Sequence, residues 1–453
     1  MNRQFSLGLG LLLLGPAAVY ANPVAESLRP RARAALPVAQ IEEVVSRAAP
    51  FDAVQVAPAR SLRPFLRPTA LSRVQPAPTS TASHQGFERW KTGFRPRALA
   101  QGISPRTFDR AFANVRFDPD IVAKDQKQAE FAKGIWSYLD SAVSDTRVDN
   151  GRAALRKHAA LLDRIEAHYG VDKEIVLAVW GMETNYGSFR GTENVVEAMA
   201  SLAYDGRRAS FFEKQLIATL QILEAGDTTP DNMKGSWAGA MGHTQFMPTS
   251  FQSLAVDFTG DGRRDIWGDD PSDALASTAN YLAKNGWIKG MPWGVEVRLP
   301  RDFNYANLGI ARMPSEWARL GVRGMDGQPV RDHGSAEILL PAGHKGAAFL
   351  VFKNFRVIKR YNAADAYAMG VGHLADRIKG AAPFKGDWPR EDRPLTSTER
   401  KELQTRLTRA GFATGGVDGR IGPNTTSAIQ SYQKRSGLVP DGYPSMTLLA
   451  RLR

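Results

Sequence analysis

The sequence predicts an α+β protein that is mostly helical, with a small β-containing insertion and a small helical module at the C-terminus. Helical periodicity runs from about residue 87 to 224, and short β-like runs replace it between about 290 and 355. Helical signals return at 364–378 and again after residue 395. The chain has 453 residues, 43% of them hydrophobic, which is enough for two or three domains. A collagen-like or wholly disordered chain is therefore excluded.

The charge and the absence of cysteine limit the functions that the chain can have. Lys and Arg number 59 against 46 Asp and Glu, and the net charge of +13 favours an anionic partner such as nucleic acid, a membrane surface or an acidic polymer. Without cysteine there are no disulfides, zinc–thiolate sites, iron–sulfur clusters or thiol nucleophiles, and no lipid anchor on cysteine. Beyond the N-terminal segment, no apolar run approaches the ~20 residues that a membrane-spanning helix needs.

Residues 1–21 have the features of a signal peptide. Arg3 gives a positive start, residues 5–14 are apolar, and Val19-Tyr20-Ala21 forms a small-x-small cleavage site. We expect cleavage after Ala21, and therefore an exported protein that is periplasmic or associated with the cell envelope. Retention of the segment as an uncleaved anchor is the alternative.

Residues 22–85 are expected to form a flexible tether. Between residues 22 and 84 the chain has nine of its 27 prolines and eight arginines, but no lysine. Proline lacks an amide hydrogen and restricts the residue before it, so this composition disfavours helices and sheets. A partly polyproline-like tether is the expected result.

The domain expected at residues 86–379 begins with a series of helices. Residues 125–143 and 153–169 are each expected to form one helix, and Gly170 is expected to end the second one in a left-handed conformation. Asp172 is placed to cap the next helix. The apolar stripe of that helix consists of Ile175, Val176, Val179 and Met182.

The insertion and the end of this domain follow from a change of pattern. Short β-like runs at 295–299, 337–340 and 347–352 predict the strands of the insertion, and residues 364–378 predict a last helix. Gly, Pro and charged residues then cluster without periodicity at 380–394, so we expect a linker there.

Residues 395–453 are expected to form a small helical bundle. Thr396 and Glu399 can form a capping box at the start of its first helix. Two turns, Val417-Asp418-Gly419 and Pro440-Asp441-Gly442, resemble each other, and each precedes a short amphipathic helix. A length of about sixty residues is near the lower limit for a domain that folds without disulfides or metals.

Glu183 is the strongest candidate for a catalytic residue. It ends the apolar helix that follows Asp172, and its carboxyl is expected to be desolvated by Val179, Trp180, Met182, Tyr186 and Phe189. Desolvation favours the protonated form of a carboxyl, which is what a general acid requires at neutral pH. The alternative is a glutamate at a helix end that turns to solvent.

A second segment, residues 236–248, combines glycines with neutral polar side chains. Gly239 and Gly242 lie among small residues, which lets the backbone approach a ligand. Ser236 and Gln245 offer hydrogen-bonding groups without charge. The alternative is a packed junction between a helix and a turn.

These two segments together resemble the lytic murein transglycosylases of the membrane-bound type B family. They carry Glu-Thr-Asn-Tyr-Gly at 183–187 and, about fifty residues later, Gly-Ala-Met-Gly-x-x-Gln-Phe-Met-Pro at 239–248. The resemblance covers residues 86 to 378 and continues through motifs at 125–131, 204–208, 279–282 and 360–362. The C-terminal region, with its motifs at 417–423 and 428–433, looks like a peptidoglycan-binding module of the three-helix type.

The resemblance implies a lysozyme-like fold and cleavage of the β-1,4 bond between N-acetylmuramic acid and N-acetylglucosamine without water, which leaves 1,6-anhydromuramic ends. Glu183 would act first as acid and then as base, and no cofactor is needed for catalysis. A hydrolase usually has two carboxylates at the bond, and no second one occurs near Glu183 in an equally apolar setting.

The resemblance also implies roles for further residues. Ser236 and Gln245 would position the acetamido sugars, and Tyr281, Tyr361 and Tyr367 would line the groove. Arg207 and Arg208 would face lactyl or peptide carboxylates, with a solvated basic surface as the alternative.

Residues 257–265 follow the rhythm of an EF-hand loop. Oxygen ligands occupy positions one, three and five, glycine is at six and a carbonyl is at seven, but position twelve is Gly268 instead of glutamate. In the similar family a later aspartate closes such a site, which here is Asp273. A structural Ca²⁺ or Na⁺ would then be held by Asp257, Thr259, Asp261, the Arg263 carbonyl and Asp273. A turn without metal is the alternative.

Three other functions are alternatives to the transglycosylase. The first is a non-catalytic peptidoglycan-binding protein, and the second is a hydrolytic muramidase with a second carboxylate such as Glu193 or Asp205. The third, nucleic-acid binding, is disfavoured because the basic residues are spread along the chain and no nucleic-acid motif occurs. We expect a monomer whose partner is the peptidoglycan glycan strand.

Overall fold

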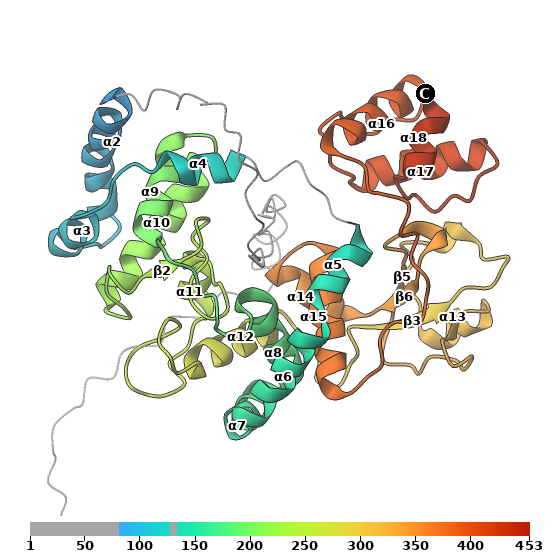
Figure 1. The fold of residues 1–453 in the computed structure, drawn as a ribbon, viewed down its shortest axis with the longest axis horizontal. Coiled ribbons are helices and arrows are strands. Elements are labelled where there is room, and N and C mark those ends of the chain that lie inside the picture. The colour runs from blue at the N-terminus through green and yellow to red at the C-terminus, as the bar shows by residue number, and fades with distance from the viewer. Residues whose placement is uncertain (1–80, 127–133) are drawn as a thin grey trace, which may run out of the picture. The chain divides into compact units, whose positions relative to one another are not determined.

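The computed structural model describes residues 81–126 and 134–453 (Figure 1). All of the described residues belong to one compact unit. The predicted signal peptide and most of the predicted tether lie outside the described residues. The end of the predicted tether, however, is helical from Thr81. Over the described ranges, no helix combines the length and the apolar character needed to cross a membrane.

The part of the chain before the C-terminal module is mostly helical and has two main hydrophobic cores. One core surrounds α8, α12 and α15, and the other surrounds α3, α9 and α10. Tyr281 and Tyr361 pack against both cores. The helices are α2 (Thr81–Leu99), α3 (Pro105–Phe112), α4 (Pro119–Gln126), α5 (Ile135–Ala142), α6 (Asp145–Lys157), α7 (Ala159–Tyr169), α8 (Lys173–Thr184), α9 (Val195–Asp205), α10 (Ala209–Ala225), α11 (Pro248–Leu254), α12 (Ser272–Lys284), α13 (Pro314–Arg319), α14 (Lys353–Tyr361) and α15 (Asp365–Lys379).

Two of the predicted helices are interrupted. The helix expected at 125–143 is divided, because Gly134 has the extended backbone angles φ −57° and ψ 147° at the start of α5. A Cβ at this position would lie 2.6 Å from the Trp136 ring, so the glycine makes room for that side chain. The helix expected at 153–169 is divided at His158, where the chain bends so that α6 packs on α8 and α15 while α7 packs on α12. Gly170 ends α7 in the left-handed conformation, as predicted.

Asp172 precedes α8, but its side chain does not cap the helix as expected. Its Oδ2 accepts hydrogen bonds from the Trp287 indole at 2.9 Å and from the Gly290 amide at 3.3 Å. The carboxylate therefore ties the start of α8 to the segment that follows α12. A contact with residues more than a hundred positions away replaces the local cap.

The insertion contains a four-stranded antiparallel sheet with the order β4-β3-β6-β5. Its strands are β3 (Gly294–Arg298), β4 (Arg323–Gly324), β5 (Glu337–Leu339) and β6 (Ala348–Val351), and Leu350 is the register partner of both Val295 and Ile338. The three predicted strands are confirmed. β4 was missed because two residues are too short for a periodic signal. A second small sheet pairs β1 (Glu193–Asn194) with β2 (Lys234–Gly235).

The C-terminal module is formed by α16 (Ser397–Arg409), α17 (Pro423–Arg435) and α18 (Met446–Leu452) around its own core. The predicted capping box is confirmed. The Thr396 hydroxyl accepts a bond from the Glu399 amide at 3.2 Å, and the Glu399 carboxylate accepts one from the Thr396 amide at 2.8 Å.

The two similar turns of the module are held by the same set of hydrogen bonds, and we call this set the glutamine–turn network. Gln404 donates to Asp418 Oδ1 at 2.9 Å and accepts from the Gly419 amide at 2.7 Å. Gln433 donates to Asp441 Oδ1 at 2.7 Å and accepts from the Gly442 amide at 2.9 Å. Each buried glutamine comes from the preceding helix, so the second copy repeats the first.

The second copy also contacts the insertion. Asp441 Oδ2 accepts a bond from the His344 amide at 2.9 Å and lies 2.5 Å from His344 Nδ1. The segment expected as a linker has no helix or strand at 380–394, but it packs against the preceding part of the chain. Phe384 stacks on His373 with ring centroids 3.7 Å apart, and Glu296 accepts bonds from the amides of Lys385 and Gly386.

We predict that two glycine-to-alanine substitutions in helices have opposite effects on stability. In α15, a Cβ at Gly372 would lie 2.4 Å from the buried Trp293 ring, which is held by a bond to Asp376. Gly372→Ala should therefore lower the free energy of unfolding by about 1–3 kcal/mol. In α2, Gly93 is exposed and a Cβ there meets nothing within 4 Å, so Gly93→Ala should raise it by about 0.5–1 kcal/mol. Chemical denaturation of both variants measures these changes. If both substitutions changed the free energy of unfolding in the same direction, the packing described here would be contradicted.

Candidate active site

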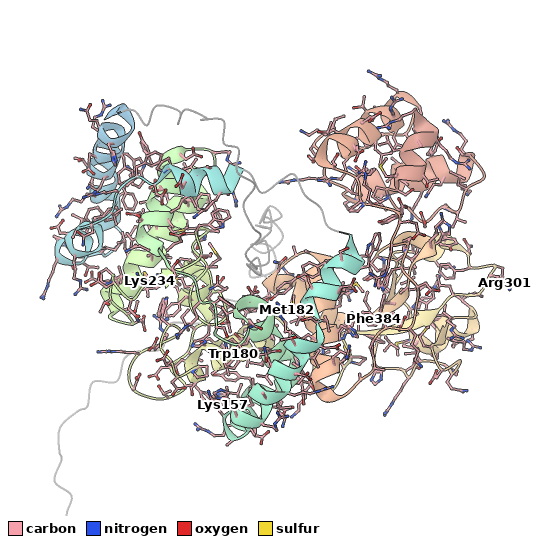
Figure 2. All side chains as sticks on the ribbon, viewed as in Figure 1. Lys157, Trp180, Met182, Lys234, Arg301 and Phe384 are labelled. Atoms are coloured by element: carbon pink, nitrogen blue, oxygen red, sulfur yellow. The ribbon has the colours of Figure 1, made fainter. Side chains whose placement is uncertain are left out.

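Glu183 lies in the last turn of α8, a helix that is buried along most of its length. The chain turns sharply after it, because Asn185, Tyr186 and Gly187 all have positive φ angles of 49°, 57° and 83°. Left-handed backbone is unfavourable for residues with a side chain, so the surrounding contacts must hold this turn. Figure 2 labels Trp180 and Met182, the neighbours of Glu183 on the same helix.

The Glu183 carboxyl is crowded by protein, and among the described residues it has one direct hydrogen-bond donor. The Tyr367 hydroxyl, from α15, donates to Glu183 Oε1 at 2.6 Å. Burial raises the pKa of Glu183 to about 7, although the Tyr367 bond lowers it in part. The expected desolvation is thus supported, with one correction: Phe189 is 67% exposed and does not take part in it.

The charge of Glu183 affects the pKa values of three nearby tyrosines. Burial raises the pKa of Tyr138, Tyr361 and Tyr367, and the negative charge of Glu183 raises it further in each. Their hydroxyls therefore stay protonated and remain hydrogen-bond donors at neutral pH. Tyr138 was not predicted as a site residue, because its spacing with Ile135 and Leu139 is that of an ordinary buried face.

The predicted groove tyrosines Tyr281 and Tyr361 form one aromatic group with Phe246. The two tyrosine rings are 4.8 Å apart, and each centroid is 5.9 Å from Phe246. The Tyr361 hydroxyl donates to the Thr244 carbonyl at 2.6 Å and that of Tyr281 donates to the Arg360 carbonyl at 2.5 Å. The structure thus brings the 236–248 segment together with α12 and α14.

Ser236 and Gln245 have different environments. Ser236 Oγ accepts a bond from the Ala240 amide at 3.1 Å, which closes the turn that follows it. Gln245, with φ 53°, donates through Nε2 to the Arg190 carbonyl at 3.1 Å and to the Gly242 carbonyl at 2.9 Å. Among the described residues nothing donates to its Oε1, so this amide oxygen can accept a bond from a ligand.

The glycines of this segment serve internal packing, and their expected role in letting a ligand approach stays a prediction. A Cβ on Gly239 would lie 2.3 Å from the Met199 side chain, and one on Gly242 would lie 2.2 Å from the Ile266 carbonyl oxygen. Both also have positive φ angles, of 85° and 67°. The segment is tightly packed against the core.

Arg207 and Arg208 already have partners inside the protein. Arg207 forms an ion pair with Asp125, whose side chain is largely buried. The Arg208 guanidinium lies 4.5 Å from the centroid of the Phe211 ring. A role of these two residues toward substrate carboxylates stays a prediction.

The carboxylates considered for a hydrolase do not influence Glu183. Its pKa is shifted by burial and by Tyr367 alone. Glu193 lies in β1 and forms an ion pair with Lys124 at 3.0 Å, and Asp205 is the last residue of α9. Neither Glu193 nor Asp205 therefore contributes to the raised pKa of Glu183.

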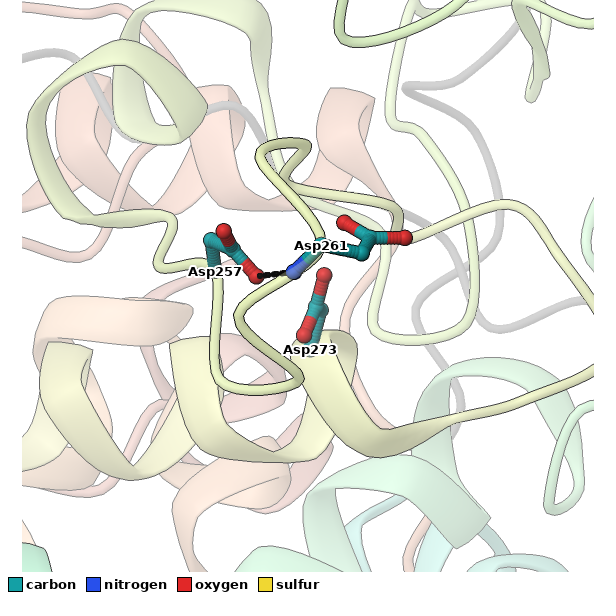
Figure 3. A group of neighbouring side chains, drawn as sticks. All are labelled: Asp257, Asp261 and Asp273. Carbon is teal, nitrogen blue, oxygen red and sulfur yellow. Dashed lines mark hydrogen bonds between the residues drawn. The ribbon is translucent and has the colours of Figure 1, made fainter.

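The predicted cation loop brings three carboxylates together. One oxygen each from Asp257, Asp261 and Asp273 lies within 4.8 Å of the others, and Figure 3 shows the Asp273 carboxylate pointing from the start of α12 toward the loop. Burial raises the pKa of Asp273, and the negative charge of Asp257 adds to this. Carboxylate oxygens around one point, one of them buried, fit a hard cation such as Ca²⁺.

The remaining loop contacts fit the same interpretation. The Thr259 hydroxyl donates to Asp257 Oδ1 at 3.2 Å, and the Arg263 amide donates to Asp261 Oδ1 at 2.9 Å. Asp273 accepts bonds from the amides of Phe258, Thr259 and Asp265, at 2.9 to 3.0 Å. Asp273 therefore fixes the loop from the position that the sequence assigned to it.

The fold and this site define a class of enzyme: a lysozyme-like carbohydrate-cleaving enzyme with one protonatable glutamate. The comparisons with known proteins agree. Residues 86–376 match the family described as Transglycosylase SLT domain, and residues 396–452 match the putative peptidoglycan binding domain. The chain belongs to the transglycosylase SLT family, which confirms the predicted family and fold class.

Individual relatives share much of the chain. SltB3 from Pseudomonas aeruginosa, solved in complex with NAG-anhNAM-pentapeptide, is 52% identical with a TM-score of 0.80 over 82% of this chain and 100% of its own. The membrane-bound lytic murein transglycosylase B of Escherichia coli (strain K12) is 35% identical over 253 residues, which are 54% of this chain and 68% of that protein. The lytic transglycosylase Slt35 of Escherichia coli, solved with calcium, is 28% identical with a TM-score of 0.56, over 66% of this chain and 94% of its own.

We predict that Glu183→Gln stabilises the protein more at high pH than at low pH. The folded-state pKa of about 7 lies above the ordinary value of 4.5, so the stability that Glu183 contributes is present below pH 4.5 and is lost as the pH rises through 7. Glutamine cannot ionise and should therefore raise the free energy of unfolding by about 3 kcal/mol at pH 8, but only by about 1 kcal/mol at pH 5.

Urea denaturation at the two pH values measures this difference. Glu391→Gln, at an exposed position, is the matched control and should change little at either pH. An equal effect of Glu183→Gln at both pH values would show that its carboxyl is not held in the protonated form.

Proposed function

We propose that the protein is a lytic transglycosylase that cleaves the β-1,4 bond between N-acetylmuramic acid and N-acetylglucosamine in peptidoglycan and forms 1,6-anhydromuramic ends. The single observation that carries the proposal is the Glu183 carboxyl, with a pKa of about 7 and no second carboxylate acting on it. SltB3, 52% identical to this chain, was solved with NAG-anhNAM-pentapeptide, and a second structure holds NAG-NAM-pentapeptide. These ligands contain the sugars of the proposed reaction.

In the proposed mechanism one carboxyl group moves the proton twice. Protonated Glu183 gives its proton to the glycosidic oxygen as the bond from that oxygen to C1 of the muramic acid breaks. The carboxylate then takes the proton of the C6 hydroxyl, whose oxygen forms the new bond to C1. No water enters, and Glu183 ends protonated. A pKa near the working pH suits a group that acts as both acid and base.

Neighbouring groups have supporting roles in this proposal. Tyr367 donates to Glu183 Oε1 and stabilises the ionised form between the two proton transfers. Gln245 offers its free amide oxygen, and Ser236 its hydroxyl, to the acetamido groups. Tyr281 and Tyr361 would form the wall of the groove, while Arg207 and Arg208 would face carboxylates of the substrate at its edge.

The remaining parts of the chain would bring the enzyme to its substrate. The expected division is a signal peptide at 1–21, a tether at 22–85, a catalytic domain at 86–379, a linker at 380–394 and a peptidoglycan-binding domain at 395–453. The module would raise the local concentration of the enzyme on the polymer. We propose export to the periplasm or cell envelope, a monomeric state and peptidoglycan as the partner, with no lipid anchor on cysteine.

We also infer that the loop at 257–273 holds a structural Ca²⁺ or Na⁺. The ligands would be Asp257, Thr259, Asp261, the Arg263 carbonyl and Asp273. The three clustered carboxylates support this, as does the existence of a calcium complex of Slt35. The ion would stabilise the loop, while the reaction itself uses no cofactor.

We predict that Glu183→Gln abolishes turnover of isolated cell-wall sacculi, while the protein stays folded and bound to them. Loss of an acid/base group lowers rates by about 10²–10⁴-fold, and this group would act twice. Mass analysis of the muropeptides identifies the product, because a 1,6-anhydro end is lighter by one water than a hydrolysed end. Release of hydrolysed ends by the unsubstituted enzyme would indicate a muramidase instead.

Tyr367→Phe tests the proton position separately. The Tyr367 bond lowers the pKa of Glu183, so its removal should move the alkaline limb of the kcat profile to higher pH. Tyr305→Phe, at a partly buried tyrosine of the insertion, is the control and should leave the profile in place. If the pH profile of kcat for Tyr367→Phe coincided with that of the control, Tyr367 would not set the pKa of Glu183.

We predict that Ca²⁺ raises the melting temperature and that Asp257→Ala combined with Asp261→Ala abolishes the rise. A ligand that binds only the folded state stabilises it by mass action, by about 2.7 kcal/mol at a hundred times its Kd. Differential scanning calorimetry with calcium and with chelator measures the effect. Asp231→Ala, at an exposed aspartate outside the loop, should keep the full rise. Superimposable curves for the unsubstituted protein would mean that the loop holds no calcium.

A further inference from the structure

His243 is buried at the junction of three segments and has no part in the mechanism above. Its side chain is 4% exposed, and it lies in the turn between Gly242 and Gln245. The Trp180 indole nitrogen lies 3.1 Å from His243 Nδ1, and the Gly268 carbonyl oxygen lies 2.7 Å from His243 Nε2. The ring therefore bridges α8 and the segment that follows the cation loop.

The two contacts define the protonation of the ring. An indole N–H can only donate, so Nδ1 is the acceptor and the proton lies on Nε2, where it is donated to Gly268. Arg190 Nη1 also lies 3.3 Å from Nε2, but it donates to the carbonyls of Trp267 and Gly268. Burial lowers the pKa of His243, which favours this neutral form. The charged groups that face it are Arg190, Asp265 and Asp269, of opposing signs. His243 is thus a neutral connector with one acceptor and one donor in use.

The same residue holds the turn that follows Glu183. The Thr184 hydroxyl donates to the His243 carbonyl at 2.6 Å and accepts a bond from the Gly187 amide at 3.0 Å. A Cβ on Gly187 would lie 2.7 Å from His243 Nδ1, so the turn passes directly against the ring. Glu183 is therefore fixed from both sides, by Trp180 three residues before it and by Thr184 after it.

His243 is also bonded to the 266–268 segment, and Arg190 holds that segment in place. Its amide donates to the Ile266 carbonyl at 2.9 Å. Arg190 donates to the carbonyls of Trp267 and Gly268 at 2.7 Å and 2.5 Å, and forms an ion pair with Asp269 at 2.9 Å. The 266–268 segment is thus a fixed support against which His243 can hold α8.

We propose that His243 is a positioning residue for the reaction: its imidazole fixes Trp180 against the 266–268 segment and thereby sets the place of the Glu183 carboxyl. The proposal rests on the proposed acid/base role of Glu183. A displacement of about 1 Å at a reacting group can cost about 10²-fold in rate, so two hydrogen bonds at this junction can matter for kcat without touching the substrate.

Two substitutions separate the two hydrogen bonds of the ring. In His243→Asn, the amide oxygen falls near the place of Nδ1 and can still accept the Trp180 bond, while the bond to Gly268 is lost. In His243→Gln, the amide nitrogen reaches the place of Nε2 and can still donate to Gly268, while the Trp180 bond is lost. Trp180→Phe removes the indole donor and keeps an aromatic ring.

The experiment measures kcat and KM on soluble peptidoglycan fragments for these variants, alone and combined. We expect each single variant to lower kcat about 10- to 100-fold with little change in KM. Trp180→Phe should lower kcat again in the His243→Asn background, but not in the His243→Gln background, where the bond is already absent. The alkaline limb of the kcat profile should move to lower pH, because a displaced Glu183 meets more water.

The control is His373→Asn, at a buried histidine of α15 that stacks on Phe384 and lies outside this junction. It should lower the melting temperature as the His243 variants do, but leave kcat and its pH profile unchanged. If a His243 variant does not fold, the kcat of Trp180→Phe alone tests the proposal. An unchanged kcat in Trp180→Phe, or the same effect of this substitution in every background, would overturn the proposal. A hydrolysed product from the unsubstituted enzyme would refute the proposed function. The role of His243 would then still be decided by the ratios of kcat between the variants.

Discussion

The catalytic part of the chain is organised around one half-buried carboxyl group that the surrounding protein largely withdraws from water. Helix α8 is apolar on nearly all sides, so the fold has to surround it, and α6, α7, α12 and α15 all pack against it. Glu183 adds a polar side chain to the last turn of this apolar helix. Among the described residues, the hydroxyl that donates to it comes from Tyr367 of α15. Burial that would be costly for a structural glutamate is what the proposed acid/base role of Glu183 requires.

Much of this arrangement could be predicted from the sequence, because the features concerned are local or strongly periodic. The apolar stripe before Glu183, the capping box at Thr396 and the three β-like runs are each defined within about fifteen residues, and the structure contains all of them. The fold class and the family followed from ordered motifs spread over most of the folded chain. The raised pKa of Glu183 agrees with the desolvation expected from the apolar residues around it in the sequence.

The features that could not be predicted depend on contacts distant in sequence. Asp172 has the sequence position of a cap, but it bonds to Trp287 instead. Tyr138 has the spacing of a core residue, yet its hydroxyl lies within the field of Glu183. His243 occupies a position that the recognised motif leaves unspecified, and no periodic pattern indicates that Trp180 will donate to it. In all three cases tertiary structure brings together residues more than forty positions apart.

The glutamine–turn network of the C-terminal module has an evolutionary consequence. The two copies repeat one helix-and-turn unit within a short segment, and selection can act on each copy separately. The first copy, at Asp418, holds the module together, whereas in the second copy Asp441 has the same internal partner and also bonds to His344 outside the module. Substitutions at Asp441 are therefore constrained by two surfaces at once. Sequence drift in related chains should be slower there than at Asp418, and it should be accompanied by changes at His344.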